Sequence, residues 1–196
     1  GRSPGTAQGD PGVDHPVVRR CARVRAAGCC AGTTRSGTIA GDMSLIITPA
    51  EAAQKLTATE IWPHLWQGGV PPKGPGARTA GFDVVVFCAK EHQYTSRDYP
   101  GVTVIRAPLD DSGPPITELE WKIAQAAGIE VTKRLKAGHR CLVTCAQGIN
   151  RSGLVNAVAI HDLTGIPGYR VIDLIRSRRP GALGNKSFVE KIRTLR

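Results

Sequence analysis

Along most of the chain, short apolar runs alternate with longer segments whose apolar residues recur every three or four positions. The runs at 82–88, 102–106 and 141–145 each predict a buried strand. Residues 60–67 predict a further strand or a broken hairpin, which a pair of glycines ends. Strands that alternate with helices indicate an α/β fold, here a single domain with a central, mainly parallel sheet flanked by helices.

The longest helical pattern covers residues 116–135. Thr117 and Glu120 have the spacing of a capping box at its start, and Gly138 marks its end. The positions expected to form its inner face are Ile116, Leu119, Ile123, Ala127, Val131 and Leu135.

Three more helices are expected in the C-terminal third. Residues 152–163 are apolar nearly all round, so this helix should be buried. Residues 169–178 are amphipathic and end before Pro180, and residues 186–195 turn a third apolar face inward. A short helix from residue 48 to about 56 is expected near the other end, because a threonine and a proline precede a glutamate there.

Residues 1–42 differ from the remainder. They are rich in Gly, Arg, Ala, Ser and Thr and have no sustained apolar periodicity, and the chain's one methionine is Met43. We expect 1–42 to be a leader added for expression or translated from upstream sequence, with the natural start at Met43 and the folded domain at 43–196. The alternative is a genuine disordered arm.

Composition limits which partners and which cellular compartment are expected for the domain. The 196 residues carry a net charge of +10, which favours anionic partners such as phosphorylated protein, inositol lipid, nucleic acid or a membrane surface. A protein that is simply basic explains the charge equally well. No apolar run is long enough to span a bilayer, and the six cysteines lack disulfide or zinc spacing. Without the apolar segment of a signal peptide, a reducing cytoplasm is the simplest expectation.

The segment with the clearest chemistry runs from residue 143 to 153. A buried strand ends at Cys145, a tight loop contains Gly148, and Arg151 stands where the buried helix begins. A loop that curls round a phosphate can present several backbone N–H groups, and Gly148 permits close approach or a positive φ. The candidate phosphate-binding residues are Ala146, Gln147, Gly148, Ile149, Asn150 and Arg151.

The side chains of this segment have matching roles. Arg151 offers a planar fork for the oxygens of a phosphoryl group, and the same positive field favours a thiolate at Cys145. Ser152 is placed to donate a hydrogen bond to that sulfur and to help it leave in a second step. The alternative is a buried cysteine that ends a core strand, with a surface arginine nearby.

These residues resemble the signature C-x-x-G-x-x-R-S of the dual-specificity branch of the protein tyrosine phosphatase superfamily. The resemblance continues through residues 61–69, 106–111 and 175–188, so it covers roughly 58–196. It implies a protein-tyrosine-phosphatase-like fold and a phosphocysteine mechanism without metal or cofactor, with Cys145 as nucleophile. The expected substrate is a phosphorylated protein, bearing phosphotyrosine with or without phosphoserine and phosphothreonine.

By the family pattern Asp111 is the general acid, with Asp110 as the competing candidate. A leaving alkoxide or phenolate has to be protonated as its bond to phosphorus breaks, and the same carboxylate can then deprotonate water. Both aspartates follow a strand in a loop with a glycine and two prolines. For both, the alternative is a solvated turn carboxylate or a helix cap.

The sequence departs from the family pattern at Thr144, where a histidine is usual. We expect a Cys145 pKa above the family's usual value but below that of a free thiol, with the Thr144 hydroxyl limited to a local hydrogen bond. The resemblance has Asn185 bonded to the phosphate loop or its neighbours, although turn formation explains it nearly as well. Arg178 and Arg179 either widen the anion-binding surface or form a solvated helix end.

Cys88 closes a buried strand in a stretch that resembles the tumour-suppressor inositol-lipid phosphatase. By that resemblance, Cys88 forms a reversible disulfide with Cys145 under oxidation. The alternative is a buried structural cysteine.

Three other functions remain open at this stage. They are removal of the γ-phosphate from RNA 5′-triphosphates, the one case with a nucleic-acid partner; hydrolysis of an inositol phosphate or phospholipid; and phosphate binding with weak or lost catalysis. The Gly148–Gly153 segment resembles the RNA branch to some degree, and Thr144 keeps the binding module open.

Overall fold

The computed structural model describes residues 56–113 and 115–196. The expected leader at 1–42, the start at Met43 and the short helix from residue 48 lie outside these residues. The domain boundary at residue 43 therefore stays an expectation.

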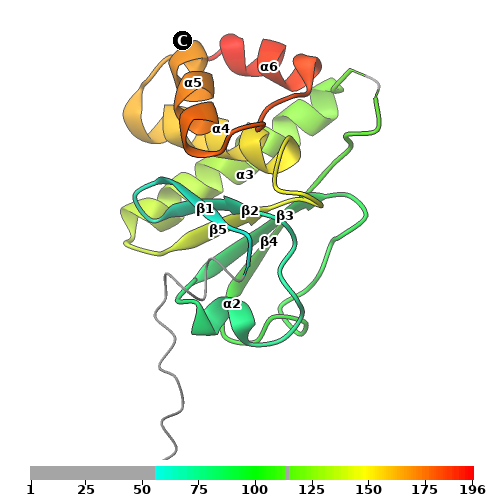
Figure 1. Ribbon diagram of the computed structural model, residues 1–196, viewed down its shortest axis with the longest axis vertical. Helices are drawn as coiled ribbons and strands as arrows, with labels where there is room; N and C mark the ends of the chain where they lie inside the picture. Colours follow the sequence, from blue (N-terminus) through cyan, green and yellow to red (C-terminus); the bar gives the residue numbers. More distant parts are fainter. Residues whose placement is uncertain (1–55, 114) are drawn as a thin grey trace, which may run out of the picture. The chain divides into compact units, whose positions relative to one another are not determined.

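Five strands form one mixed, mostly parallel sheet (Figure 1). In spatial order they are β1 (Thr59–Trp62), β2 (Leu65–Gly68), β5 (Cys141–Thr144), β3 (Val84–Ala89) and β4 (Thr103–Leu109). β1 and β2 pair antiparallel, so residues 60–67 form the broken hairpin, and β5 pairs parallel with both β2 and β3. The expected α/β architecture with a mainly parallel sheet is confirmed.

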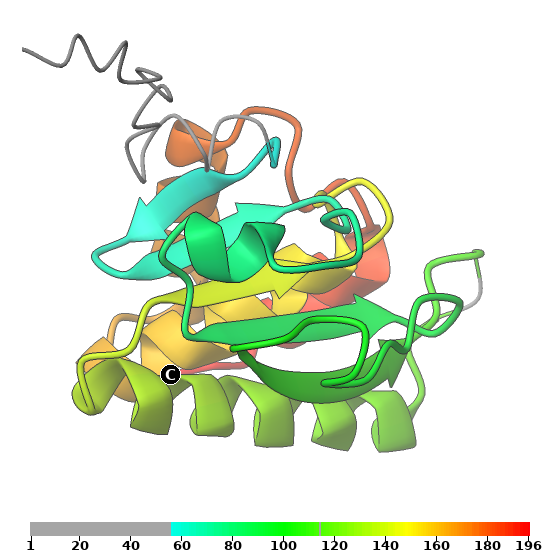
Figure 2. The same ribbon diagram turned by 90° about the horizontal axis from the view of Figure 1, so that it is seen from below.

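Helices cover both faces of the sheet unequally. One face is covered by α3 (Glu118–Lys136), α4 (Arg151–Thr164) and α5 (Gly168–Arg178), and α6 (Lys186–Arg193) packs on α4 and α5. The short α2 (Gly76–Thr79) lies on the other face (Figures 1 and 2). Strand residues alternate between the two cores: Val84, Val86 and Cys88 face the four-helix side, and Val85 and Phe87 face the α2 side.

The inner face of α3 is close to the expected one, since Ala127 and Val131 are buried and Ile116, Ile123 and Leu135 pack against the core. The capping box of Thr117 and Glu120 is present, yet Leu119 is 69% exposed. The side chains that pack inward include Trp121 and small residues, because α3 and α4 cross closely. A Cβ on Gly128 would lie 2.5 Å from Cγ1 of Val158, so the contact depends on the missing side chain.

The parallel strands determine where the candidate active site lies. Because β3, β4 and β5 run in the same direction, the loops that follow Ala89, Leu109 and Thr144 emerge at one edge of the sheet (Figure 2). The third loop leads directly into α4, whose first ten residues are all buried, as its apolar sequence predicts. Cys145 thus begins a loop anchored by a central strand and a buried helix.

Candidate active site

Gly148 gives the loop between β5 and α4 its shape. Its φ is +68°, and a Cβ there would lie 2.3 Å from the carbonyl carbon of Gly68. The close approach expected from the sequence is therefore confirmed. One expectation needs correction: the N–H of Gly148 donates to the carbonyl oxygen of Cys145 at 3.3 Å. This group turns into the loop, so Gly148 contributes its conformation rather than a donor for phosphate.

Gln67, a fully buried residue of β2, holds the loop from behind. Its Nε2 donates to the carbonyl oxygens of Gly148 at 3.0 Å and Ile149 at 3.2 Å. Its Oε1 accepts from Nδ2 of Asn156 at 3.2 Å, which fixes the orientation of the amide. Sequence reasoning missed Gln67, although a polar residue inside an apolar strand was the available signal.

Arg179 also holds the loop, which corrects both interpretations of the arginine cluster. Its Nε donates to the carbonyl oxygen of Gly148 at 2.7 Å, and its Nη2 donates to that of Gln147 at 3.2 Å. The neighbouring Arg178 is exposed, as a solvated helix end would be. Arg179 is therefore a structural partner of the loop, neither part of a general anion-binding surface nor free in solvent.

The thiol of Cys145 is only 2% exposed and lies 3.3 Å from Oγ of Ser152. Burial acts to raise its pKa, but it is outweighed by hydrogen bonds from the Ser152 hydroxyl and from the backbone N–H groups of Ser152 and Ile149, together with the charge of Arg151. The pKa of Cys145 is thus lowered from that of an ordinary thiol. This direction agrees with the expectation of a value below that of a free thiol.

Thr144 takes no part in holding the sulfur. Its side chain is fully buried, and its hydroxyl donates to the carbonyl oxygen of Val86 at 2.8 Å. The expected local hydrogen bond is present, and it joins β5 to β3. The stabilisation of a thiolate at Cys145 therefore comes from the loop and from the residues that hold it.

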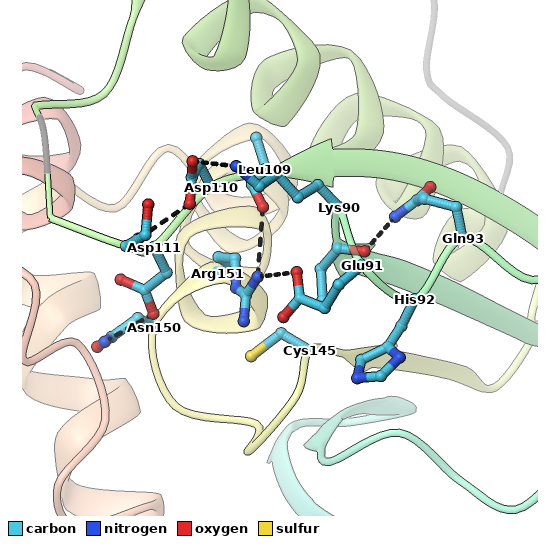
Figure 3. A network of polar contacts seen from close by, with 12 residues as sticks. Lys90, Glu91, His92, Gln93, Leu109, Asp110, Asp111, Cys145, Asn150 and Arg151 are labelled. Carbon is cyan, nitrogen blue, oxygen red and sulfur yellow. Dashed lines mark hydrogen bonds and ion pairs between the residues drawn. The ribbon is translucent and has the colours of Figure 1, made fainter.

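Arg151 is 7% exposed and fixed on one side (Figure 3). Its Nη1 donates to Oε2 of Glu91 at 2.7 Å and approaches the carbonyl oxygen of Leu109 at 3.4 Å. Its buried Nε has no partner within residues 56–113 and 115–196. The hydrogen bond from Arg151 lowers the pKa of Glu91 despite partial burial, so Glu91 is a carboxylate at neutral pH. Glu91 was missed, although an acid directly after a buried strand signals such a pair.

Both carboxylate oxygens of Asp111 accept a side-chain amide. Asn150, in the loop that follows Cys145, donates to Oδ2 at 3.0 Å (Figure 3). Asn185 donates to Oδ1 at 2.8 Å. Asn185 also starts α6, where its Oδ1 accepts the N–H of Ser187, and its own N–H donates to Oδ1 of Asn150 at 3.2 Å. Both interpretations of Asn185, loop contact and turn formation, are therefore correct.

Asp110 has different partners. It forms an ion pair with Lys90, and its Oδ1 accepts the N–H of Ser112 at 2.9 Å. The hydrogen bond from Lys90, with those of Ser112, holds the pKa of Asp110 well below its usual range. A carboxyl group that stays ionised in this way is a poor proton donor, which favours Asp111 as the acid.

These groups surround one cleft of about 450 Å³. It is lined by Lys90, Glu91, Asp110, Asp111, Ser112, Cys145, Ala146, Gln147, Ile149, Asn150 and Arg151. The structure thus brings together the nucleophile, the arginine and the acid expected from the sequence, at the strand edge where three loops meet.

Cys88 belongs to the same hydrophobic core as Cys145, on the four-helix side of the sheet. It is a fully buried free thiol, and burial followed by the nearby charge of a Cys145 thiolate raises its pKa well above the usual value. The disulfide between these two residues stays a prediction.

Comparisons with known proteins agree with this geometry. No family model matches the chain. The human protein called protein tyrosine phosphatase type IVA 3 is 29% identical over 115 residues, which span 56% of this chain and 63% of that relative. The chain therefore covers less than two thirds of that relative's length.

Two solved structures illustrate the likeness of fold. Human DUSP28 is 22% identical, with a TM-score of 0.58 over 71% of this chain and 92% of DUSP28. PTPMT1 in complex with PI(5)P is 17% identical, with a TM-score of 0.61 over 71% of this chain and 94% of PTPMT1. The expected protein-tyrosine-phosphatase-like fold is confirmed by these structures. Within the described residues, no helix has the length and apolar character needed to cross a bilayer.

Proposed function

We propose that this chain is a cysteine-dependent phosphatase that hydrolyses phosphate monoesters through a phosphocysteine intermediate. The observation that carries the proposal is the joint placement of Cys145, Arg151 and Asp111 on one cleft. In that cleft a buried thiol has a lowered pKa, and a buried guanidinium nitrogen lacks a partner among the described residues. A phosphate dianion would satisfy that nitrogen and the loop N–H groups together.

Binding positions the substrate for attack. Arg151 is held by Glu91 through Nη1, so its Nε and Nη2 can take two oxygens of the phosphoryl group. The backbone N–H groups of the loop and the N-terminus of α4 add positive potential beneath the phosphorus. This arrangement favours a trigonal phosphoryl group in transit over the bound ester.

In the first chemical step, the Cys145 thiolate attacks phosphorus and forms an S–P bond as the ester P–O bond breaks. Asp111 donates its proton to the departing oxygen, so the alcohol or phenol leaves neutral. The product is phosphocysteine, and Asp111 is now a carboxylate.

In the second step, water attacks the phosphorus of the intermediate. The Asp111 carboxylate accepts a proton from that water, and the S–P bond breaks to release inorganic phosphate. The Ser152 hydroxyl, 3.3 Å from the sulfur, donates a hydrogen bond to the thiolate as it leaves. The enzyme returns to its starting protonation state.

Phosphotyrosine in a protein, with or without phosphoserine and phosphothreonine, is the proposed substrate class. The curated relative is a tyrosine phosphatase by name, which supports this assignment. A second candidate is an inositol phosphate or phospholipid, because the structural neighbour PTPMT1 was solved with PI(5)P. The compartment we propose is the cytoplasm, since Cys88, Cys141 and Cys145 are all free thiols.

A substrate panel tests the proposal. Wild type and Cys145→Ser are assayed with an aryl phosphate, phosphopeptides, inositol phosphates and a triphosphorylated RNA. We expect aryl phosphate and phosphotyrosine turnover that Cys145→Ser abolishes. Aryl phosphatase activity that survives in Cys145→Ser would contradict the mechanism. Vanadate binding without turnover in the wild type would instead indicate a phosphate-binding module.

A further inference from the structure

Arg179 is fully engaged by the protein itself. It follows α5, and its Nε and Nη2 donate to the carbonyl oxygens of Gly148 and Gln147, as described above. Its Nη1 donates to Oγ1 of Thr59 at 2.9 Å and to the carbonyl oxygen of Thr57 at 3.2 Å. With an acceptor for each of its three nitrogens, the guanidinium has little left to offer a ligand. Its charge is directed at the back of the phosphate loop.

The carbonyl of Gly148 is the focus of these contacts. It accepts from Nε of Arg179 at 2.7 Å and from Nε2 of Gln67 at 3.0 Å. The N–H of the same peptide group belongs to Ile149, and this N–H acts to lower the pKa of the Cys145 thiol. One peptide therefore joins a cation and a buried amide on one side to the nucleophile on the other.

Such an arrangement has a defined electrostatic effect. A cation at the oxygen of a peptide withdraws electron density and makes the N–H of that peptide a stronger donor. The low dielectric of a buried loop preserves the effect, and the positive charge also acts on the thiolate directly. In agreement, the Cys145 charge counteracts the lowering of the Arg179 pKa by burial.

Because of Thr144, the contribution of Arg179 to stabilising the Cys145 thiolate is more important. The residue before the nucleophile directs its hydroxyl to Val86, so it offers the sulfur no hydrogen bond. Apart from Ser152 and Arg151, the groups that favour the thiolate are backbone N–H groups, and the peptide of one of them is held by Arg179.

We propose that Arg179, together with Gln67, is a positioning residue that activates Cys145 through the Gly148–Ile149 peptide. The effect on turnover rests on the proposed phosphatase function. The effect on the thiol requires only the geometry of the loop.

The test compares Arg179→Met and Arg179→Lys with the matched control Arg178→Met, which changes the exposed neighbour. Alkylation of Cys145 by iodoacetamide is followed against pH, with peptide mapping to separate Cys145 from the other cysteines. We expect Arg179→Met to raise the midpoint by about one pH unit. Arg179→Lys keeps the charge without the fork, so its midpoint should lie between those of wild type and Arg179→Met. Arg178→Met should match wild type.

Thermal unfolding of each variant identifies those that are folded. If Arg179→Met does not fold, the alkylation midpoint of Arg179→Lys is compared with that of wild type instead. A folded Arg179 variant with the wild-type midpoint overturns the inference, as does an equal shift in Arg178→Met.

Turnover of an aryl phosphate is measured separately. We expect kcat to fall about tenfold in Arg179→Met with little change in KM, because the ionised fraction and reactivity of the nucleophile change more than the substrate contacts do. Alkylation needs no turnover, so the two proposals can fail independently. A midpoint shift in a protein without phosphatase activity keeps the role of Arg179 and rejects the proposed function.

Discussion

Asn150 and Asp111 are joined by a 3.0 Å hydrogen bond that ties the phosphate loop to the loop carrying the proposed acid. The side-chain amide of Asn150 is itself held in place, because its Oδ1 accepts the backbone N–H groups of Gly184 and Asn185. The position of the proposed acid is therefore set by the same loop that holds Cys145.

Replacing Asn150 should affect proton donation more than nucleophilic attack. We expect Asn150→Ala to lower kcat about tenfold for an alkyl or phenyl phosphate and much less for an activated aryl ester, because only a poor leaving group needs the proton. Steady-state rates with the two ester types measure this difference. In an Asp111→Ala background the same substitution should have little further effect, and fully additive losses would contradict the coupling.

The two aspartates should differ in the same assay. Asp111→Ala is expected to slow hydrolysis of poor leaving groups by roughly 10²-fold or more, as loss of a general acid does. Asp110→Ala should have a much smaller effect, since that carboxylate is paired with Lys90. A larger loss in Asp110→Ala would assign the acid role to Asp110 instead.

The activity should depend on the ionisation of Cys145. Because the pKa of this thiol is lowered in the folded protein, the reactive thiolate persists to a lower pH than an ordinary thiol allows. Activity should fall as the pH drops through that pKa and reach a plateau above it. The kcat/KM of Asp111→Ala with an activated aryl ester isolates this limb. A midpoint at or above about 8.5 would show that the loop does not activate the thiol.

Mild peroxide should convert Cys145 to a sulfenic acid, which the Cys88 sulfur then attacks to form a disulfide and release water. Burial raises the pKa of Cys88, so this second step should be slow compared with attack by an exposed thiolate. Peptide mapping without reductant should find the crosslinked pair, and dithiothreitol should restore activity. In Cys88→Ser the oxidation should become irreversible. Overoxidised Cys145 with no crosslink in the wild type would leave Cys88 as a structural cysteine.

Packing between α3 and α4 should depend on Gly128. We expect Gly128→Ala to lower the free energy of unfolding by about 1–3 kcal/mol, because the added methyl group overlaps Val158. Gly76→Ala is the control, since a Cβ there would meet no atom of the described residues within 4 Å. Chemical denaturation of both variants measures the difference, and equal stabilities would mean that α4 moves aside without cost.

The sequence was sufficient to predict the strands, the four long helices and the loop from Cys145 to Arg151, because local patterns specify each of them. It was insufficient where distant segments meet. Gln67 and Arg179 lie far from the loop in sequence, and nothing local indicates that both bind the carbonyl of Gly148. On α3, the assignment of Leu119 to the inner face was wrong, and the close packing at Gly128 was missed because a glycine carries no apolar signal.

The side chain of Asn185 serves two structures at once. It accepts the first N–H groups of α6 with one atom and holds the carboxylate of Asp111 with the other. The position of the proposed acid is therefore coupled to the start of the last helix through one side chain. The proposed nucleophile directly follows a central strand, whereas the proposed acid depends in part on the docked C-terminal segment, so loosening of α6 would disturb proton donation before it disturbed the thiol.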